Sequence, residues 1–207
     1  MRVFTQEPKP DGAVEQGLDD EERWLVEQAK QDPEAFGQLY QRYVKRIYGY
    51  HYQFTRNREE AEDLTSRTFF QALRGIGTYA ERGLRFQAWL YRIAHNLMAN
   101  WCRDQSRHPV TDLESVELVL AAEEGNPQAD LAGAEERERM RLAVEALPED
   151  RKTLLILKFV EKMPNSEIAR VLGRSEGAVK VLYHRTLSSL REQAKGAPRG
   201  GADVSMD

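Results

Sequence analysis

The stretch that decides the fold is MPNSEIARVLGRSEGAVKVLYHRTLSSLREQ, residues 163–193. It predicts a helix-turn-helix, with a short helix, a corner centred on Gly173 and a longer second helix. Glycine suits the left-handed backbone that a tight corner requires. Asn165 is predicted to cap the first helix and Ser175 the second. Residues at helical spacing are predicted to face inward: Ile168, Ala169, Leu172, Val179, Tyr183, Thr186 and Leu190.

The outward face of the second helix is polar and largely basic. It holds Arg174, Glu176, Lys180, His184 and Arg185. In a DNA-binding helix-turn-helix the second helix enters the major groove, where lysine and arginine contact guanine edges or phosphates. The alternative is an ordinary helical hairpin with a solvated basic face, and this segment by itself leaves both interpretations open.

Charge is segmented along the 207 residues, so the net charge of −4 is a poor guide to partners. Residues 84–108 hold four arginines against one acid, and residues 165–195 hold six bases against three acids. Residues 109–130, between them, hold six acids and no base. Two basic segments separated by an acidic one predict two nucleic-acid-binding modules and a linker.

Several function classes are excluded by composition. The single cysteine, Cys102, forbids an internal disulfide and a cysteine-rich zinc site, and the four histidines lack metal-ligand spacing. No run approaches the roughly 20 apolar residues of a membrane span, and the N-terminus lacks a signal core. We therefore expect a cytoplasmic, non-enzymatic protein with no cofactor, metal or small-molecule substrate.

Helical periodicity without any strand pattern predicts an all-α chain of two small domains. We expect a disordered tail over residues 1–18, a bundle of about four helices over 19–108, an acidic linker over 109–131, a second domain over 132–195 and a flexible tail over 196–207. Within the bundle, Asp32 with Pro33 and then Asn57 are predicted N-caps. One helix is expected to stop near Gly75, and another to run from Phe86 to about residue 107. An apolar helix over 153–160 is expected beneath the helix-turn-helix.

The segment FQAWLYRIAHNLMANWCRDQSRH, residues 86–108, combines aromatic residues with arginines. Stacking on aromatic rings tolerates any base, while arginine binds the backbone, so this mixture suits unpaired strands. The preceding loop, residues 79–85, lies where it could form a pocket for a flipped base. The alternative is that the aromatic residues, Trp89 in particular, belong to the core.

Three segments together resemble a group 4, extracytoplasmic function (ECF), sigma factor of the sigma-70 family. They are DPEAFGQLYQRYVKRIYGYHYQFTRNREEAEDLTSRTFFQAL, FQAWLYRIAHNLMANWCRD and LPEDRKTLLILKFVEKMPNSEIARVLGRSEGAVKVLYHRTLSSLRE. The resemblance implies that the first domain is sigma region 2 and the second is region 4. It also implies binding to core RNA polymerase, promoter recognition and strand opening, with an anti-sigma factor as inhibitor.

The resemblance assigns residues to three surfaces. The helix that docks on the clamp helices of the largest polymerase subunit would include Glu62, Asp63, Leu64, Thr68 and Phe69. Recognition and melting of the minus-10 element would use Tyr79, Arg85, Phe86, Trp89, Arg92, His95, Asn96 and Arg103. The minus-35 element would be read by Arg174, Ser175, Glu176, Lys180, His184 and Arg185. The flap of the second-largest subunit is a further expected partner.

Val181 and Leu182 depart from the family pattern, because small or basic residues are common at these positions. They would contact thymine methyl groups or a partner protein. Asn100 stands where the family often has aspartate. The acidic linker is hypothesised to lie in a polymerase channel built for RNA. The main rival function is a stand-alone helix-turn-helix regulator, which would bind duplex tightly without polymerase.

Overall fold

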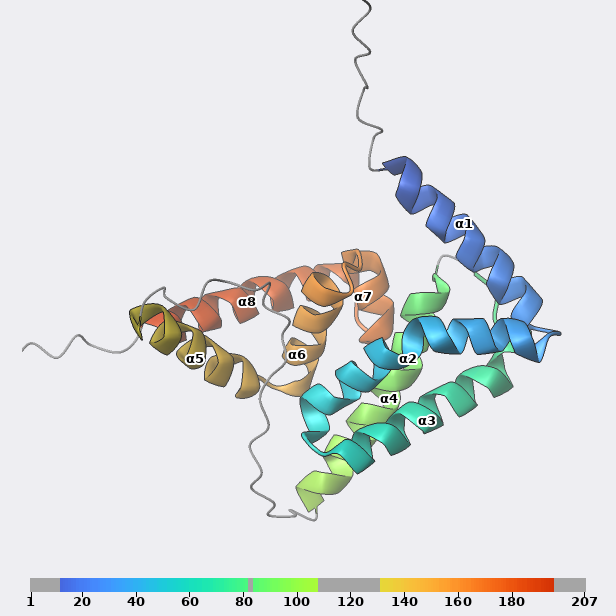
Figure 1. The fold of residues 1–207 in the computed structure, drawn as a ribbon. Coiled ribbons are helices and arrows are strands. Elements are labelled where there is room, and N and C mark those ends of the chain that lie inside the picture. Colours follow the sequence, from blue (N-terminus) through green and yellow to red (C-terminus); the bar gives the residue numbers. More distant parts are fainter. Residues whose placement is uncertain (1–11, 82–83, 108–130, 196–207) are drawn as a thin grey trace, which may run out of the picture. The chain divides into compact units, whose positions relative to one another are not determined.

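The computed structural model describes residues 12–81, 84–107 and 131–195. All regular secondary structure within these ranges is helical (Figure 1). The predicted all-α fold class is confirmed for these ranges. Contacts divide the chain into two units, one up to Ser106 and one from Arg107 onward, and each is described by itself. Over the same ranges, none of the helices has the length and apolar character that a bilayer crossing requires.

The described residues of the first unit form four α-helices. These are α1 (Gly12–Ala29), α2 (Pro33–Thr55), α3 (Arg58–Gly75) and α4 (Phe86–Arg107), with a short 3-10 turn, η1 (Ile76–Thr78), after α3. Helix α2 packs against both α1 and α3 (Figure 1). The predicted tail over residues 1–18 is corrected in part, because α1 begins at Gly12. Ala13, Glu15 and Gln16 are strong helix formers and extend the helix across this segment.

Local capping explains where these helices begin and end. The Asp32 side chain accepts a hydrogen bond from the Glu34 amide at 2.9 Å, and Asn57 Oδ1 accepts one from the Glu60 amide at 3.1 Å. Both predicted N-caps are confirmed. Helix α3 ends at Gly75, as predicted, and its backbone tightens into η1.

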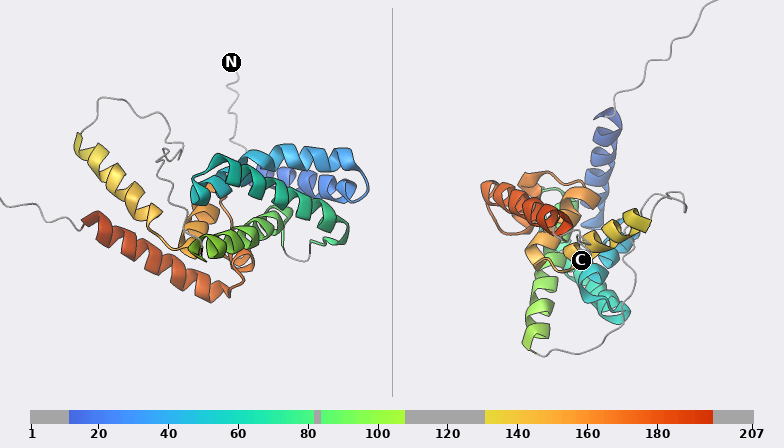
Figure 2. Two further views of the ribbon diagram at one scale, coloured as in Figure 1. Left: turned by 90° about the horizontal axis from the view of Figure 1, so that it is seen from below. Right: turned by 90° about the vertical axis from the view of Figure 1, so that its left-hand side faces the viewer.

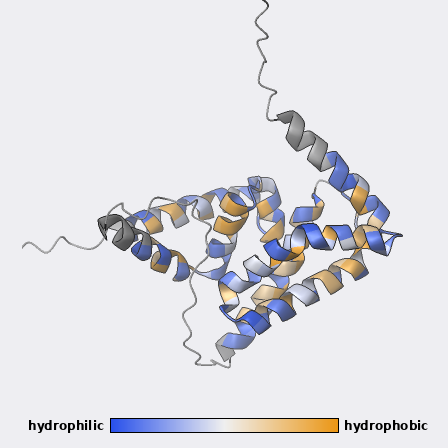
Figure 3. Ribbon diagram, viewed as in Figure 1, coloured by the Kyte–Doolittle hydropathy of each residue, from blue (hydrophilic) through white to orange (hydrophobic). Residues whose placement is uncertain are grey.

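The core of the first unit is formed where α2, α3 and α4 meet. Leu39, Ile47, Leu64, Leu90 and Met98 are completely buried there. Each such side chain stabilises the fold by about 1.5–3 kcal/mol relative to its exposed state. Figure 3 shows hydrophobic and hydrophilic residues alternating along the coloured parts of the helices, as amphipathic helices around a core require.

The second unit is built around a long C-terminal helix. Its elements are α5 (Leu131–Glu145), α6 (Glu149–Leu155), a π-helical turn η2 (Ile156–Val160), α7 (Asn165–Val171) and α8 (Glu176–Lys195). Helix α8 contacts α5, α6 and α7 (Figure 2). Leu154, Leu157, Ile168 and Val179 are completely buried between them. The predicted acidic linker and C-terminal tail lie outside the described residues, apart from Leu131, which begins α5.

Two predictions for the second unit are wrong in detail. The apolar helix over 153–160 does not stay α-helical, because the Glu161 amide donates to the Ile156 carbonyl five residues earlier. This wider turn leaves Phe159 and Val160 each 57% exposed. Asn165 is the first residue of α7 and not its cap, and its Oδ1 accepts a hydrogen bond from Lys158 Nζ at 3.0 Å.

Candidate nucleic-acid interface

The corner between α7 and α8 has the backbone geometry of a helix-turn-helix. Gly173 has φ +62°, and the following Arg174 amide donates to the Ala169 carbonyl at 2.8 Å. Ser175 Oγ accepts a hydrogen bond from the Ala178 amide at 3.2 Å and so caps α8. These three features confirm the corner predicted from the sequence.

The N-terminal half of α8 presents the polar face predicted for it. Arg174, Ser175, Glu176, Lys180, His184 and Arg185 are all exposed. Lys180 Nζ lies 3.1 Å from Glu176 Oε1, and Arg174 forms an ion pair with Asp150 at the start of α6. Both pairs lie at the surface and contribute at most about 1 kcal/mol each, so a DNA phosphate can displace either carboxylate.

The two apolar residues that depart from the family pattern differ in exposure. Val181 is 50% exposed, whereas Leu182 is half-buried. On another side of α8, Tyr183 lies beside Phe159 of η2, with 6.2 Å between ring centroids. The second unit therefore carries exposed apolar side chains close to its basic face as well as within it.

In the first unit, several residues predicted to bind separated strands are part of the core. Phe86 is 3% exposed and His95 is 7% exposed, and Tyr79 is also buried. The rings of Tyr79 and Trp89 lie 4.9 Å apart and that of Phe86 packs against both. His95 Nδ1 lies 3.3 Å from the hydroxyl of Tyr50. The prediction that Tyr79, Phe86 and His95 form a stacking surface for unpaired bases is therefore corrected. These side chains are buried, and their burial stabilises the bundle instead.

The exposed residues of α4 form a polar stripe. Arg92, Asn96, Asn100 and Arg103 recur at three- and four-residue steps and are all exposed. Arg103 Nη1 donates to Asn100 Oδ1 at 3.3 Å, which holds the two side chains together. This stripe can bind a phosphate backbone, while Trp89 and Arg85 at the start of α4 are half-buried.

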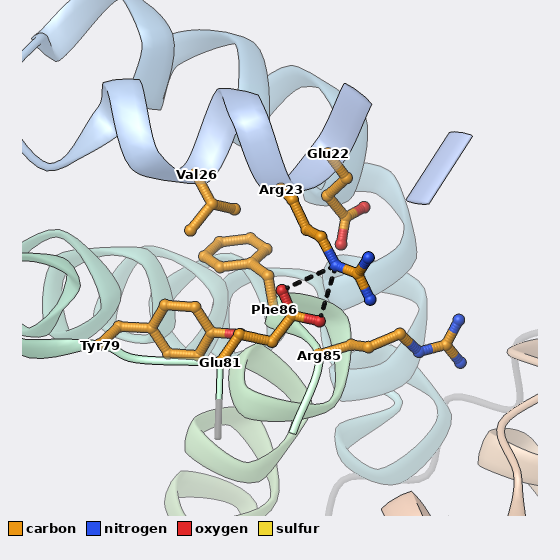
Figure 4. Close-up of a pocket in the computed structure, with 7 residues that line it drawn as sticks. All are labelled: Glu22, Arg23, Val26, Tyr79, Glu81, Arg85 and Phe86. Atoms are coloured by element: carbon orange, nitrogen blue, oxygen red, sulfur yellow. Dashed lines mark hydrogen bonds and ion pairs between the residues drawn. The ribbon is translucent and has the colours of Figure 1, made fainter. Parts of the chain in front are cut away.

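A small pocket lies between α1, the 79–85 loop and the start of α4 (Figure 4). It is lined by Glu22, Arg23, Val26, Tyr79, Glu81, Arg85 and Phe86. Arg23 Nε donates to both carboxylate oxygens of Glu81, each at 3.1 Å. The sequence located the loop, but it carried no signal that α1 would supply Glu22 and Arg23, because only tertiary packing brings these segments together.

Comparisons with known proteins agree with this arrangement of two modules. Residues 39–108 match sigma-70 region 2, and residues 137–190 match sigma-70 region 4. The chain is 36% identical to the ECF RNA polymerase sigma factor BldN of Streptomyces coelicolor, over 80% of this chain and 63% of BldN. The match therefore spans less than two thirds of the length of BldN. It is 32% identical to the RNA polymerase sigma factor CarQ of Myxococcus xanthus, over 77% of this chain and 88% of CarQ.

This chain belongs to the ECF sigma-70 family. A solved structure shares the fold: the sigma factor RpoE of Bartonella quintana, in complex with the anti-sigma factor NepR, has a TM-score of 0.58 at 21% identity. The comparison covers 78% of this chain and 97% of that chain. In the chain described here, region 2 lies in the first unit and region 4 in the second.

Within region 2, the residues predicted for polymerase binding lie on two sides of α3. Glu62 and Asp63 are exposed, whereas Leu64, Thr68 and Phe69 are buried. Thr68 Oγ1 donates to the Leu64 carbonyl at 2.7 Å, and the Phe69 ring packs edge-on against Tyr40, 4.7 Å away. The last three residues therefore hold α3 in the bundle and do not form its outer surface.

The outer surface of α3 carries two large apolar side chains that the sequence assignment missed. Phe70 is 60% exposed and Leu73 is 48% exposed. Arg74 lies over the Phe70 ring at 5.7 Å, and Arg67 pairs with Asp63 one turn earlier. The exposure of Phe70 could have been predicted from helical spacing, because a core stripe through Leu64, Thr68 and Ala72 turns residue 70 outward.

Proposed function

We propose that this sigma factor binds core RNA polymerase, directs it to specific promoters and promotes strand opening. The observation that supports the proposal is that one chain carries two exposed surfaces whose side chains suit nucleic acid in different ways. These are the capped helix-turn-helix of region 4 and the arginine–asparagine stripe of region 2. It would act where the polymerase is, in the cytoplasm, and by binding energy with no covalent chemistry of its own.

Promoter recognition divides between the two regions. In region 4, the start of α8 would enter the major groove at the minus-35 element, with Lys180 and Arg185 contacting bases or phosphates. In region 2, Arg92, Asn96 and Arg103 would hold the backbone of the minus-10 element beside the 79–85 loop. Opening a base pair costs a few kcal/mol, and capture of the extruded base by this loop would offset that cost.

Polymerase binding would use the outer face of α3. Phe70 and Leu73 supply the apolar surface, and Glu62 and Asp63 supply negative charge for a basic partner. Exposed aromatic anchors with a polar rim are typical of protein interfaces. In region 4, the exposed Phe159 and Val160 are the corresponding apolar surface for the flap of the second-largest polymerase subunit.

An anti-sigma factor would keep the protein inactive, as its membership of the ECF family implies. Such an inhibitor would need to cover the surfaces that polymerase requires. The exposed apolar side chains of α3 and η2 are therefore its expected contacts.

The test is transcription with purified core RNA polymerase on a library of promoter fragments, with permanganate footprinting of unpaired thymines. We expect transcripts that depend on this protein and a bubble at a common motif. If the protein neither binds core nor opens DNA, but binds duplex tightly alone, it is a stand-alone regulator and the proposal is wrong.

A further inference from the structure

The loop between η1 and α4 is closed on itself at its base. The hydroxyl of Tyr79 donates to the Leu84 carbonyl at 2.7 Å, which joins the first and last residues of a six-residue segment. The Tyr79 ring is buried against Trp89 and Phe86. This attachment fixes where the loop leaves and rejoins the bundle.

A second attachment comes from α1, far away in the sequence. Arg23 Nε donates to Oε1 and Oε2 of Glu81, each at 3.1 Å, as Figure 4 shows. Arg23 Nη1 also donates to Asp20 Oδ1 at 3.3 Å, one turn earlier on α1. The guanidinium is therefore held between two carboxylates, and the Glu81 limb of the loop is bound to α1 by a charge-assisted hydrogen bond.

Helix α1 is itself firmly seated on the bundle. Leu25, Val26 and Ala29 are buried, and Glu22 accepts a 2.5 Å hydrogen bond from the hydroxyl of Tyr43 on α2. A neighbouring ion pair joins Arg42 to Glu21 at 3.4 Å. Because both apolar and polar contacts hold α1, it provides a rigid support from which Arg23 can fix the loop.

We propose that Arg23 is a positioning residue, whose bond to Glu81 holds this residue of the 79–85 loop against α1, in the placement that meets the minus-10 strand. The match to region 2 begins at residue 39, so this support comes from a helix outside the matched segment. The proposal rests on the proposed function of region 2. Arg23 is 55% exposed and Glu81 26% exposed, so solvent screens the pair. Its loss should reduce strand opening about two- to fivefold and not abolish it.

The test uses Arg23→Gln, Glu81→Gln and the double variant of the full chain. Lys30→Gln is the matched control, because Lys30, the residue that follows α1, pairs with Glu27 of α1 at 2.6 Å. Backbone 15N relaxation of Ala80, Glu81 and Leu84 in the free protein measures loop order without polymerase. We expect lower order parameters in both single variants, no further loss in the double variant and no change in the control.

Permanganate reactivity and core binding are then measured with polymerase on a responsive promoter. We expect each single variant to open the promoter two- to fivefold less, and the double variant to match either single one, because both changes remove the same bond. Core affinity should not change. Unchanged loop order, or losses that multiply in the double variant, would overturn the positioning role. A wild-type protein that opens no promoter would instead overturn the proposed function, and the positioning role with it.

Discussion

Between pH 8 and pH 5, the buried His51 should lower the free energy of unfolding of region 2 by about 2 kcal/mol. Replacing His51 with leucine should abolish this loss. His51 lies on α2 and is completely buried. Thr68 Oγ1 donates its proton to the Leu64 carbonyl, so it accepts a hydrogen bond from His51 Nε2, 3.0 Å away. The neutral ring therefore carries its proton on Nε2, and Nδ1 makes no hydrogen bond among the described residues.

The magnitude follows from the direction of the pKa change. Burial lowers the pKa of His51 from 6.5 to about 3, because a charged ring would lose hydration without gaining an acceptor at Nδ1. Below about pH 6.5 the unfolded chain binds a proton that the folded chain does not bind until about pH 3. Stability is thus fully present above pH 6.5 and is lost as the pH falls through this window, by about 2 kcal/mol at pH 5.

Urea denaturation at pH 8 and pH 5, followed by tryptophan fluorescence, measures this difference. The protein has three tryptophans, Trp24, Trp89 and Trp101, and all lie in the first unit, so the signal reports that unit alone. Ile47→Val is the control, because it removes one buried methyl group a turn away from His51. It should cost about 1 kcal/mol at both pH values. If wild type and His51→Leu lose equal stability on acidification, the ring is hydrated or charged in the fold and the reasoning is wrong.

Three further predictions concern region 4 and the polymerase surface. Gly173→Ala and Ser175→Ala should each destabilise region 4 by about 1 kcal/mol, the first through its left-handed backbone and the second through the lost cap, as thermal unfolding followed by circular dichroism would show. Lys180→Gln should weaken binding of the holoenzyme to all promoters alike and reduce the salt dependence of binding by about one unit of slope if Lys180 contacts a phosphate, whereas a loss at one base position would indicate base reading. Phe70→Ser should reduce core binding with the fold intact, whereas Phe69→Ser should unfold region 2, since Phe70 is exposed and Phe69 is buried; equal unfolding by both would contradict this assignment.

Much of the local structure was predictable because its causes are local. The caps at Asp32, Asn57 and Ser175 and the left-handed Gly173 each depend on residues within one helical turn. The prediction that Asn165 caps α7 is wrong for a reason that is also local. Asparagine is a favoured cap residue, but Pro164 occupies the cap position here. The Asn165 side chain accepts a hydrogen bond from Lys158 instead.

The candidate site was less predictable, because a motif match assigns positions and not exposure. Tyr79, Phe86 and His95 have the side chains of a nucleic-acid surface, yet each is buried. On α3, Phe69 and Phe70 are adjacent and chemically identical, and one packs on Tyr40 while its neighbour faces solvent. Helical phase distinguishes such neighbours, but only the packing of whole helices fixes that phase.

The sequence by itself determined the all-α class, the two-region organisation and the basic face of α8. These depend on periodicity, capping and charge, which are written in consecutive residues. Only the tertiary structure decided that the Tyr79 ring belongs to the core, that η2 turns Phe159 outward and that Arg23 reaches Glu81 across 58 residues of chain. The physical reason is that burial and ion pairing depend on which helices meet, and that choice is settled by the packing of the whole domain.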